Sequence, residues 1–437
     1  MVFKGTQANI SDANGNLLMS SNGVWIANAT GDTMMNGGGL APSYLTTAWP
    51  YGIPLNDGAI CLPFPGDSNK LVLFHKSKWD QFSISTTALY KTIINLSLDS
   101  IIQKNDTIIT DTLSWGVGAC KHANGRDWWL FVSQDGNPKF YTFLITPNGI
   151  DTIFTQQLPS LLNTYGNVSP IKFSPNGEKM IWCSPVNQTQ SGYVLISDFN
   201  RCNGIISNTI IYPVSSTNYL FGLAFSPSGK YAYACSSNYI FQIDTDNQTV
   251  DTVAVYDGFI SPPGFTCCAT TFWGMYLAAN GKIYITSGSG VQHLHEMNYP
   301  DSAGVACDVQ QHSISLGYAQ LRSVPNHPNY YLGCDTTLGC TPCYTNVDEL
   351  SPPDFKFRVY PNPVNDGILN IGYLLPQNKH GIFEMYDITG KVVFRYTLPP
   401  WSNYQNFKLP QLSDGIYQCV ITSDGKRAVK KVAVIKE

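Results

Sequence analysis

The sequence predicts an all-β protein in two parts, a seven-bladed β-propeller followed by a small Ig-like antiparallel β-sandwich. The composition is the first observation: aromatic residues make up 13% of the 437 residues, charged residues only 13%, and Tyr and Gly abound. Such a composition is typical of half-buried strands joined by tight turns. The second observation is a regular spacing of turn motifs before residue 341. The third is a run of short strand patterns, without helical period, in residues 355–437.

The first part of the chain carries a repeat of 52 residues. Four turn pairs stand at this interval: Asn124-Gly125, Asn176-Gly177, Ser228-Gly229 and Asn280-Gly281. Two of them end the phrase Phe-Ser-Pro-x-Gly, in which Pro and Gly hold the second and fourth positions of a type I turn that closes a hairpin. Equivalent positions bring the number of repeats to seven: Asn14-Gly15, near Asp67-Ser68, and near Pro328-Asn329.

A repeat of this length, made only of strands and turns, fits one four-stranded propeller blade. In the fifth repeat we expect strands over residues 223–225, 230–235, 239–244 and 250–256. Seven such blades stack their apolar faces and close a ring without exposed sheet edges.

The seventh repeat is incomplete, with only two expected strands, over residues 321–324 and 330–333. In closed propellers the missing strands usually come from the N-terminus, but residues 8–11 already read as the first blade's inner strand. Residues 1–5 also lack the apolar core of a signal peptide. We therefore expect a propeller over residues 1–340 that is truncated at its N-terminus, a linker over 341–354, and a separate unit over 355–437.

Charge separates the two parts. Residues 355–437 hold 11 Lys and Arg against 6 Asp and Glu, whereas the preceding residues hold 15 against 24. A basic tail on an acidic body indicates two units with separate roles. The net charge of −4 argues against nucleic-acid binding, and the absence of an 18-residue apolar run argues against a transmembrane helix.

The tail contains about seven short strand patterns with turn motifs between them, which predicts an antiparallel sandwich. Two prolines flanking Asn362 must end the first strand, because proline cannot donate to a sheet. Gly390 and Gly415 mark later turns, and Lys430 and Lys431 lie in the last strand. The motif residues are Tyr360, Pro361, Asn362, Pro363, Asp387, Gly390, Lys391, Gly415, Tyr417, Lys430 and Lys431.

The order of these motifs closely resembles the C-terminal (type A) sorting domain of type IX secretion cargo, over the whole tail. The resemblance implies export through the periplasm and across the outer membrane of a Gram-negative bacterium by the type IX translocon. It also implies removal of the tail by a surface sortase, with the body then anchored to the cell surface or released. The alternative is an ordinary Ig-like accessory domain, in which the Tyr360–Pro363 run only ends a strand.

Twelve cysteines suit an oxidising compartment, and eleven of them precede the tail. Cys334, Cys340 and Cys343 lie close together at the end of the body and suggest a local disulfide, although the sequence leaves the pairing open. A zinc or redox role for Cys340 and Cys343 would require a second matching pair nearby, which the sequence lacks.

His293 and His295 are the strongest candidate metal ligands, since residues two apart share one face of a strand. Polar loop residues are ordinary at such a position, so we expect no metal, and no motif indicates a cofactor or a catalytic residue. Six tryptophans could offer flat rings to a sugar, although most should pack between blades: Trp25, Trp49, Trp115, Trp128, Trp129 and Trp273.

The sequence thus favours a binding or adhesion scaffold for a glycan or a surface protein over an enzyme. The alternative is a hydrolase or lyase that acts on polysaccharide or peptide at the central mouth of the ring. The two differ in chemistry, because a glycosidase needs two carboxyl groups about 5–10 Å apart at one end of the channel.

Overall fold

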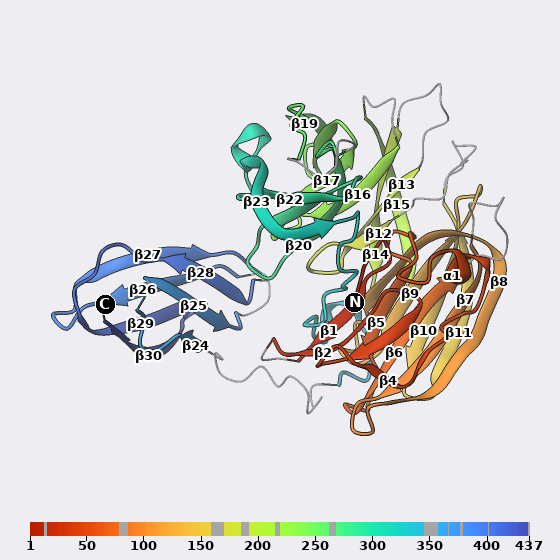
Figure 1. Cartoon of the computed structure of the whole chain (residues 1–437), viewed down its shortest axis with the longest axis horizontal. Helices are drawn as coiled ribbons and strands as arrows, with labels where there is room; N and C mark the ends of the chain where they lie inside the picture. Colours follow the sequence, from red (N-terminus) through yellow and green to blue (C-terminus); the bar gives the residue numbers. More distant parts are fainter. Residues whose placement is uncertain are drawn as a thin grey trace.

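The computed structural model describes residues 1–12, 15–77, 86–158, 170–184, 192–214, 219–261, 268–344, 357–365, 367–375, 379–400 and 402–435. These residues form thirty strands, one short helix, α1 (Tyr44–Ala48), and two 3₁₀ turns, η1 (Gly304–Cys307) and η2 (Thr336–Leu338). The protein is therefore all-β, as predicted. The sheets follow one another around the body in chain order, and the C-terminal unit, drawn in blue, stands beside it (Figure 1).

Among the described residues the body consists of six four-stranded antiparallel meanders, the first three of which are joined into one 11-stranded sheet through β8 and a parallel contact between β4 and β8. The first three sheets contain β1 (Ala8–Ser11), β2 (Leu17–Ser21), β3 (Trp25–Asn28), β4 (Thr33–Gly38); β5 (Ala59–Pro63), β6 (Lys70–Ser77), β7 (Thr86–Asn95), β8 (Ser100–Lys121); and β9 (Trp128–Gln134), β10 (Lys139–Thr146), β11 (Gly149–Gln157). The long strand β8 belongs to two of these sheets, because its first half pairs with β7 and its second half with β9.

The remaining three sheets of the body are separate. They contain β12 (Ile171–Phe173), β13 (Lys179–Ser184), β14 (Gly192–Asn200), β15 (Ile205–Val214); β16 (Leu220–Phe225), β17 (Tyr231–Ser236), β18 (Tyr239–Asp244), β19 (Thr249–Val255); and β20 (Phe272–Leu277), β21 (Ile283–Ser287), β22 (Val291–Met297), β23 (Val309–Gln320). The four strands predicted for the fifth repeat correspond to β16, β17, β18 and β19, so that prediction is confirmed.

The 52-residue turn pairs join the first and second strands of four consecutive sheets, as predicted. Their glycines, Gly125, Gly177, Gly229 and Gly281, have φ of +80°, +74°, +75° and +78°. Each glycine N–H donates to the carbonyl three residues earlier, which closes the turn. Glycine is favoured here because a side chain is strained at positive φ.

The apolar cores lie between successive sheets. Five clusters of buried side chains fill the spaces between the six sheets, with one cluster between each sheet and the next. Trp128 and Trp129 illustrate the arrangement, because adjacent residues of a strand face opposite sides: Trp128 packs toward the second sheet and Trp129 toward the fourth. This stacking brings the first strands β1, β5, β8, β12, β16 and β20 next to one another in sequence order.

The seventh pair of strands is absent from the described residues, so the strands predicted over 321–324 and 330–333 are wrong. Residues 321–333, here called the axial segment, instead run past the first strands of the sheets. Asn326 Nδ2 donates to the carbonyls of Asp57, Ala59 and Val117, and Asn329 Nδ2 donates to Pro175 O. Side chains replace sheet bonding here because prolines at 325 and 328 lack the N–H that a strand needs.

His327 links the first sheet to the last one. One ring nitrogen lies 2.8 Å from Asn9 O in β1, and the other lies 2.9 Å from the hydroxyl of Tyr276 in β20. The axial segment therefore joins the two ends of the row of sheets, where a propeller would use a shared blade.

The C-terminal unit has seven strands in two sheets. They are β24 (Phe357–Tyr360), β25 (Ile368–Tyr373), β26 (Gly381–Tyr386), β27 (Val392–Leu398), β28 (Tyr404–Lys408), β29 (Gly415–Ser423) and β30 (Lys426–Val434). One sheet has the order β24-β25-β28 and the other β27-β26-β29-β30, and both contribute to one apolar core. Tyr417, Cys419 and Ile421 share a face of β29, and all three are buried in this core. In the part of the chain that the structure describes, no helix is long and apolar enough to cross a membrane.

Candidate functional site

The motif around Asn362 covers the outer edge of the last strand. Asn362 Oδ1 accepts the N–H of Ala433 at 2.9 Å, and its Nδ2 donates to Lys431 O at 3.2 Å. Val364 continues the pairing, since its N–H donates to Ala433 O and its carbonyl accepts the N–H of Ile435. Because β30 is an edge strand, these bonds satisfy backbone groups that would otherwise be open to pairing with another chain.

The turn between β26 and β27 is built by Asp387. Its Oδ1 accepts the N–H groups of Thr389 at 2.8 Å and Lys391 at 3.0 Å, and Gly390 has φ of +82°. The hydroxyl of Thr389, which donates to the same carboxylate, lowers the pKa of Asp387 below its ordinary value. This motif thus makes a tight and ordered turn.

The remaining motif residues differ in exposure. Tyr417 is buried and its hydroxyl donates to Ser413 O at 2.8 Å, two residues before Gly415, where β29 begins. Lys430 and Lys431 are exposed on β30, opposite Cys419 and Gln418. The Asn362 bond to Lys431 brings the first and last motifs together although 69 residues separate them. Tyr360, which precedes them, is 45% exposed.

A cavity of about 810 Å³ lies where the first strands of the body end. Its walls include the axial segment on one side and the ends of β24, β25 and β28 of the C-terminal unit on the other. The lining contains many apolar residues together with tyrosine and asparagine side chains, among them Tyr276, Asn329, Tyr331, Tyr360, Asn403 and Tyr404. Among the described lining residues Asp12 is the one carboxylate, whereas Lys172 and Arg358 are basic.

The deep wall of this cavity holds a buried ion pair. Lys172 Nζ lies 3.0 Å from Asp57 Oδ2 and 3.0 Å from Asn326 Oδ1. Asp57 is 5% exposed and does not line the larger cavity; it borders a small void at the opposite end of the first strands. The carboxylates Asp12 and Asp57 therefore do not converge, and the charge of Asp57 is balanced by Lys172.

His327, also on the cavity wall, is held by hydrogen bonds at both nitrogens. Burial lowers the pKa of His327 to about 4, so the ring is neutral at pH 7. A general base needs a pKa near the working pH and a free nitrogen toward the substrate. His327 has neither, and its role here is structural.

His293 and His295 lie on β22 but do not form a shared ligand set. His295 is fully buried, its Nδ1 accepts the N–H of His312 at 3.0 Å, and burial lowers its pKa to about 4. His293 Nδ1 lies 3.2 Å from Ser261 Oγ. A search of the described ranges finds no group of three His, Cys, Asp or Glu residues able to hold a metal ion.

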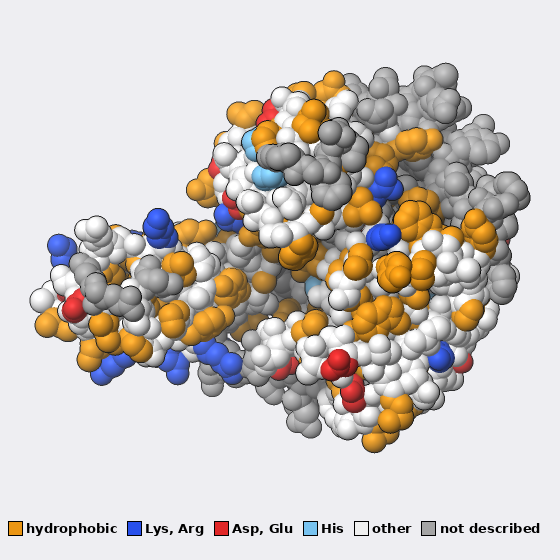
Figure 2. Space-filling view, viewed as in Figure 1, with side chains coloured by type: hydrophobic (Ala, Val, Ile, Leu, Met, Phe, Trp, Pro, Cys, Tyr) orange, Lys and Arg blue, Asp and Glu red, His pale blue; other side chains and the backbone are white. Residues whose placement is uncertain are grey.

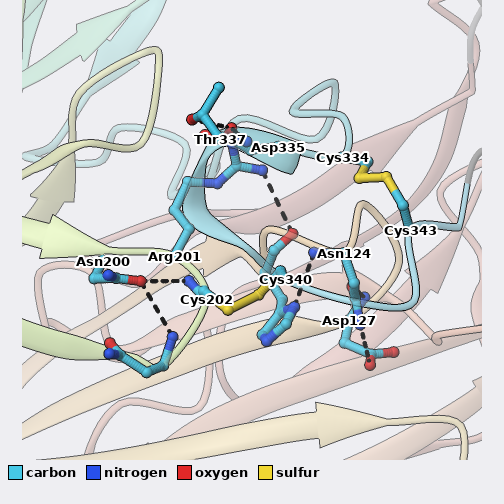
Figure 3. Close-up of a disulfide and its surroundings, with 12 residues drawn as sticks. Asn124, Asp127, Asn200, Arg201, Cys202, Cys334, Asp335, Thr337, Cys340 and Cys343 are labelled. Atoms are coloured by element: carbon cyan, nitrogen blue, oxygen red, sulfur yellow. Dashed lines mark hydrogen bonds between the residues drawn. A yellow bond between two sulfur atoms is a disulfide. The ribbon is translucent and has the colours of Figure 1, made fainter.

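Two disulfides between described residues lie just after the axial segment, and one of them fastens this end of the chain to the body (Figure 3). Cys334 is joined to Cys343, and Cys340 is joined to Cys202, which lies 138 residues away in sequence. Arg201 reinforces this site, because its guanidinium donates to the carbonyls of Lys121 and Gly333. Sequence reasoning placed the three clustered cysteines together but missed Cys202, since spacing indicates nothing about so distant a partner.

The tryptophans do not form an open aromatic platform in the described residues. Trp128 and Trp129 are buried between sheets. Trp273 is stacked on Phe221 with ring centroids 3.6 Å apart, and the Arg322 guanidinium covers it at 4.5 Å. Lys4 lies over Trp49 at 4.8 Å. The sequence analysis did not single out the tyrosines of the cavity. The abundance of Tyr, 25 residues in all, was the one sequence feature that pointed to them.

Residues 358–436 match the family model of the secretion system C-terminal sorting domain. No curated protein sequence matches the chain. Similar solved structures include a chain of the mitotic checkpoint complex, 11% identical at a TM-score of 0.40, with 74% of this chain and 80% of that chain covered. The periplasmic gluconolactonase PpgL of Pseudomonas aeruginosa is 13% identical at a TM-score of 0.38, with 79% and 87% covered.

The extracellular domain of BT4673 from B. thetaiotaomicron is 11% identical at a TM-score of 0.37, with 98% of this chain and 49% of that chain covered. All three TM-scores are too low to carry an argument, so the propeller-like character of the body rests on its own meanders. The tail needs no such support, since sequence motifs and family model agree over the same residues. Its C-terminal unit is a secretion system sorting domain, and the chain is cargo of the type IX secretion system.

Proposed function

We propose that this chain is a cell-surface or released glycan-binding protein whose ligand enters the central cavity of a propeller over residues 1–340. The part of the lining that the body supplies carries the proposal: the rings of Tyr276 and Tyr331 can stack on the faces of sugar rings, and the amide of Asn329 lies in the same wall.

The same lining argues against the alternative, a hydrolase or lyase at the central mouth. Glycoside hydrolysis uses two carboxyl groups on opposite sides of the scissile bond. Asp12 is the one carboxylate among the cavity residues that the structure describes, Asp57 is paired with Lys172, and both nitrogens of His327 are occupied.

In the C-terminal unit, the proposed roles of the motif residues divide by the bonds that they make. Asn362, Asp387, Gly390 and Tyr417 hold the shape of the unit through the bonds described above. The exposed side chains of Tyr360, Lys391, Lys430 and Lys431 are proposed to meet the type IX translocon and the surface sortase. Two sheets around one core support an Ig-like sandwich over residues 355–437, after a linker over 341–354.

This assignment sends the protein through the periplasm to the outer-membrane surface of a Gram-negative bacterium. The body can then be tested by itself, because its apolar clusters contain no residue of the C-terminal unit. Applied to a glycan array, residues 1–344 should retain a defined set of glycans and release no cleaved product.

The matched variants are Tyr331→Ala in the cavity and Tyr318→Ala, a 72% exposed residue of β23. Tyr331→Ala should raise the dissociation constant about tenfold, because it removes about 1.4 kcal/mol of stacking. Tyr318→Ala should leave the dissociation constant unchanged. An array without any retained glycan, or equal effects of the two variants, would refute the proposal. Released product would establish the hydrolase instead.

A further inference from the structure

We propose that the C-terminal unit shields the central cavity of the body, so that the cavity becomes accessible when this unit is displaced or removed. The cavity has walls from both units: the body supplies the ends of the first strands and the axial segment, and the C-terminal unit supplies residues of β24, β25 and β28. Loss of residues 355–437 therefore takes away one wall. The surface is hollowed beside the junction of the two units (Figure 2).

The C-terminal unit sits on the turn between β20 and β21 of the last sheet. The N–H of Asn403 donates to Ala279 O at 2.9 Å, and Gln405 Nε2 donates to Asn280 O at 2.7 Å. Gln405 is 5% exposed, so this bond is shielded from competing water. Both acceptors are backbone carbonyls of the body, which fixes the register between the turn and β28.

Close packing beside these bonds depends on Gly281. A Cβ added to this residue would lie 2.8 Å from Cγ of Pro399, well inside van der Waals contact. The proline ring cannot rotate away as a flexible side chain would. A side chain at position 281 must therefore push the C-terminal unit off the turn.

The C-terminal unit can also separate from the body. The described apolar clusters of the two units share no residue, so the C-terminal unit can leave without opening a hydrophobic core. The bonds between the units are few and polar, which is typical of domains that move relative to one another. The net charges of the two units are also opposite in sign, which favours their association.

The consequence for ligand binding rests on the proposed function. During export the cavity is covered, and removal of the C-terminal unit at the cell surface uncovers it. The body would then gain access to glycans only after it has reached its destination.

The test uses the full chain and compares Gly281→Ala with Gly229→Ala. Both residues hold the same position in equivalent turns, at φ of +78° and +75°, so both variants carry the same backbone strain. The added Cβ at 229 meets no atom closer than 3.6 Å, and the C-terminal unit is not among its neighbours. The accessibility probe is hydroxyl-radical labelling of Tyr331, read by mass spectrometry, together with hydrogen exchange at the Asn403 amide.

We expect a several-fold gain in Tyr331 labelling and faster Asn403 exchange in Gly281→Ala and no change in Gly229→Ala. Should Gly281→Ala not fold, Gln405→Ala should show the same gain, with the exposed Gln411→Ala as its control. Equal labelling in wild type, in the docking variants and in the isolated body would overturn the shielding. Neither readout needs a ligand: if labelling rises but the opened chain binds no glycan, shielding stands and the glycan proposal fails.

Discussion

Asn326 replaces sheet hydrogen bonds at the axis of the body. Its side chain is 2% exposed, donates to the carbonyls of Ala59 and Val117 at 3.1 and 2.8 Å, and accepts from Lys172 Nζ. One amide therefore connects the second and third sheets to the axial segment. The same residue positions the buried Lys172–Asp57 pair.

Replacing this residue by alanine tests that role. Asn326→Ala removes the amide that donates to the buried carbonyls of Ala59 and Val117, and it leaves the Lys172 ammonium with Asp57 alone, which should lower the free energy of unfolding by about 2–3 kcal/mol. Urea denaturation of the body, with and without the substitution, measures this free energy of unfolding. Asn247→Ala, at an exposed turn where Asn247 Nδ2 bonds only to Asp244, should change the same quantity by less than about 0.5 kcal/mol. A loss no larger than that of the control would contradict the structural role.

The sequence predicted correctly those residues whose type follows from the local backbone conformation. It did not predict the role of Asn326. Gly229 and Gly281 were predicted at turns because positive φ favours glycine wherever the chain reverses. Asn326 was placed in a partial blade because its partners, Ala59 and Val117, are more than 200 residues away in sequence. The prolines at 325 and 328 gave no warning, because they lie between the two predicted strands, where a turn was expected.

At the scale of elements, the spacing of the turns predicted the positions of the sheets along the chain more accurately than the lengths of their strands. The strands of the fifth repeat were predicted closely, because each is bounded by turn residues. Strand β8 was not foreseen as a 22-residue element shared by two sheets, because no turn residue marks where its pairing changes from β7 to β9.

The two disulfides should differ in their effect on stability. Cys202–Cys340 closes a loop over a sequence separation of 138, whereas Cys334–Cys343 spans only 9. Loop-closure entropy in the unfolded chain predicts a loss of about 5 kcal/mol for the first bridge and about 2.5 kcal/mol for the second. Urea denaturation of the double-serine variants measures both, and each pair serves as the control for the other. An equal loss, or a larger one for the short loop, would contradict the anchoring role of Cys202.

At the scale of the molecule, the chain separates into units that differ in charge and share no core. Residues 355–437 carry 11 basic against 6 acidic groups, and the preceding residues 15 against 24. This asymmetry and the four spaced motifs identified the sorting domain from sequence alone, and the family model over residues 358–436 confirms it. The ligand site could not be predicted in the same way, because the cavity takes its walls from ten segments that only the fold brings together.

The most direct test of the account is the location of the body with and without its sorting domain. A bacterium with a type IX system would express the full chain and a chain that ends at residue 354, followed by fractionation and surface proteolysis. We predict the full chain at the surface or in the medium, and the shortened chain folded but retained in the periplasm. A shortened chain that reaches the surface as efficiently as the full one would contradict the account.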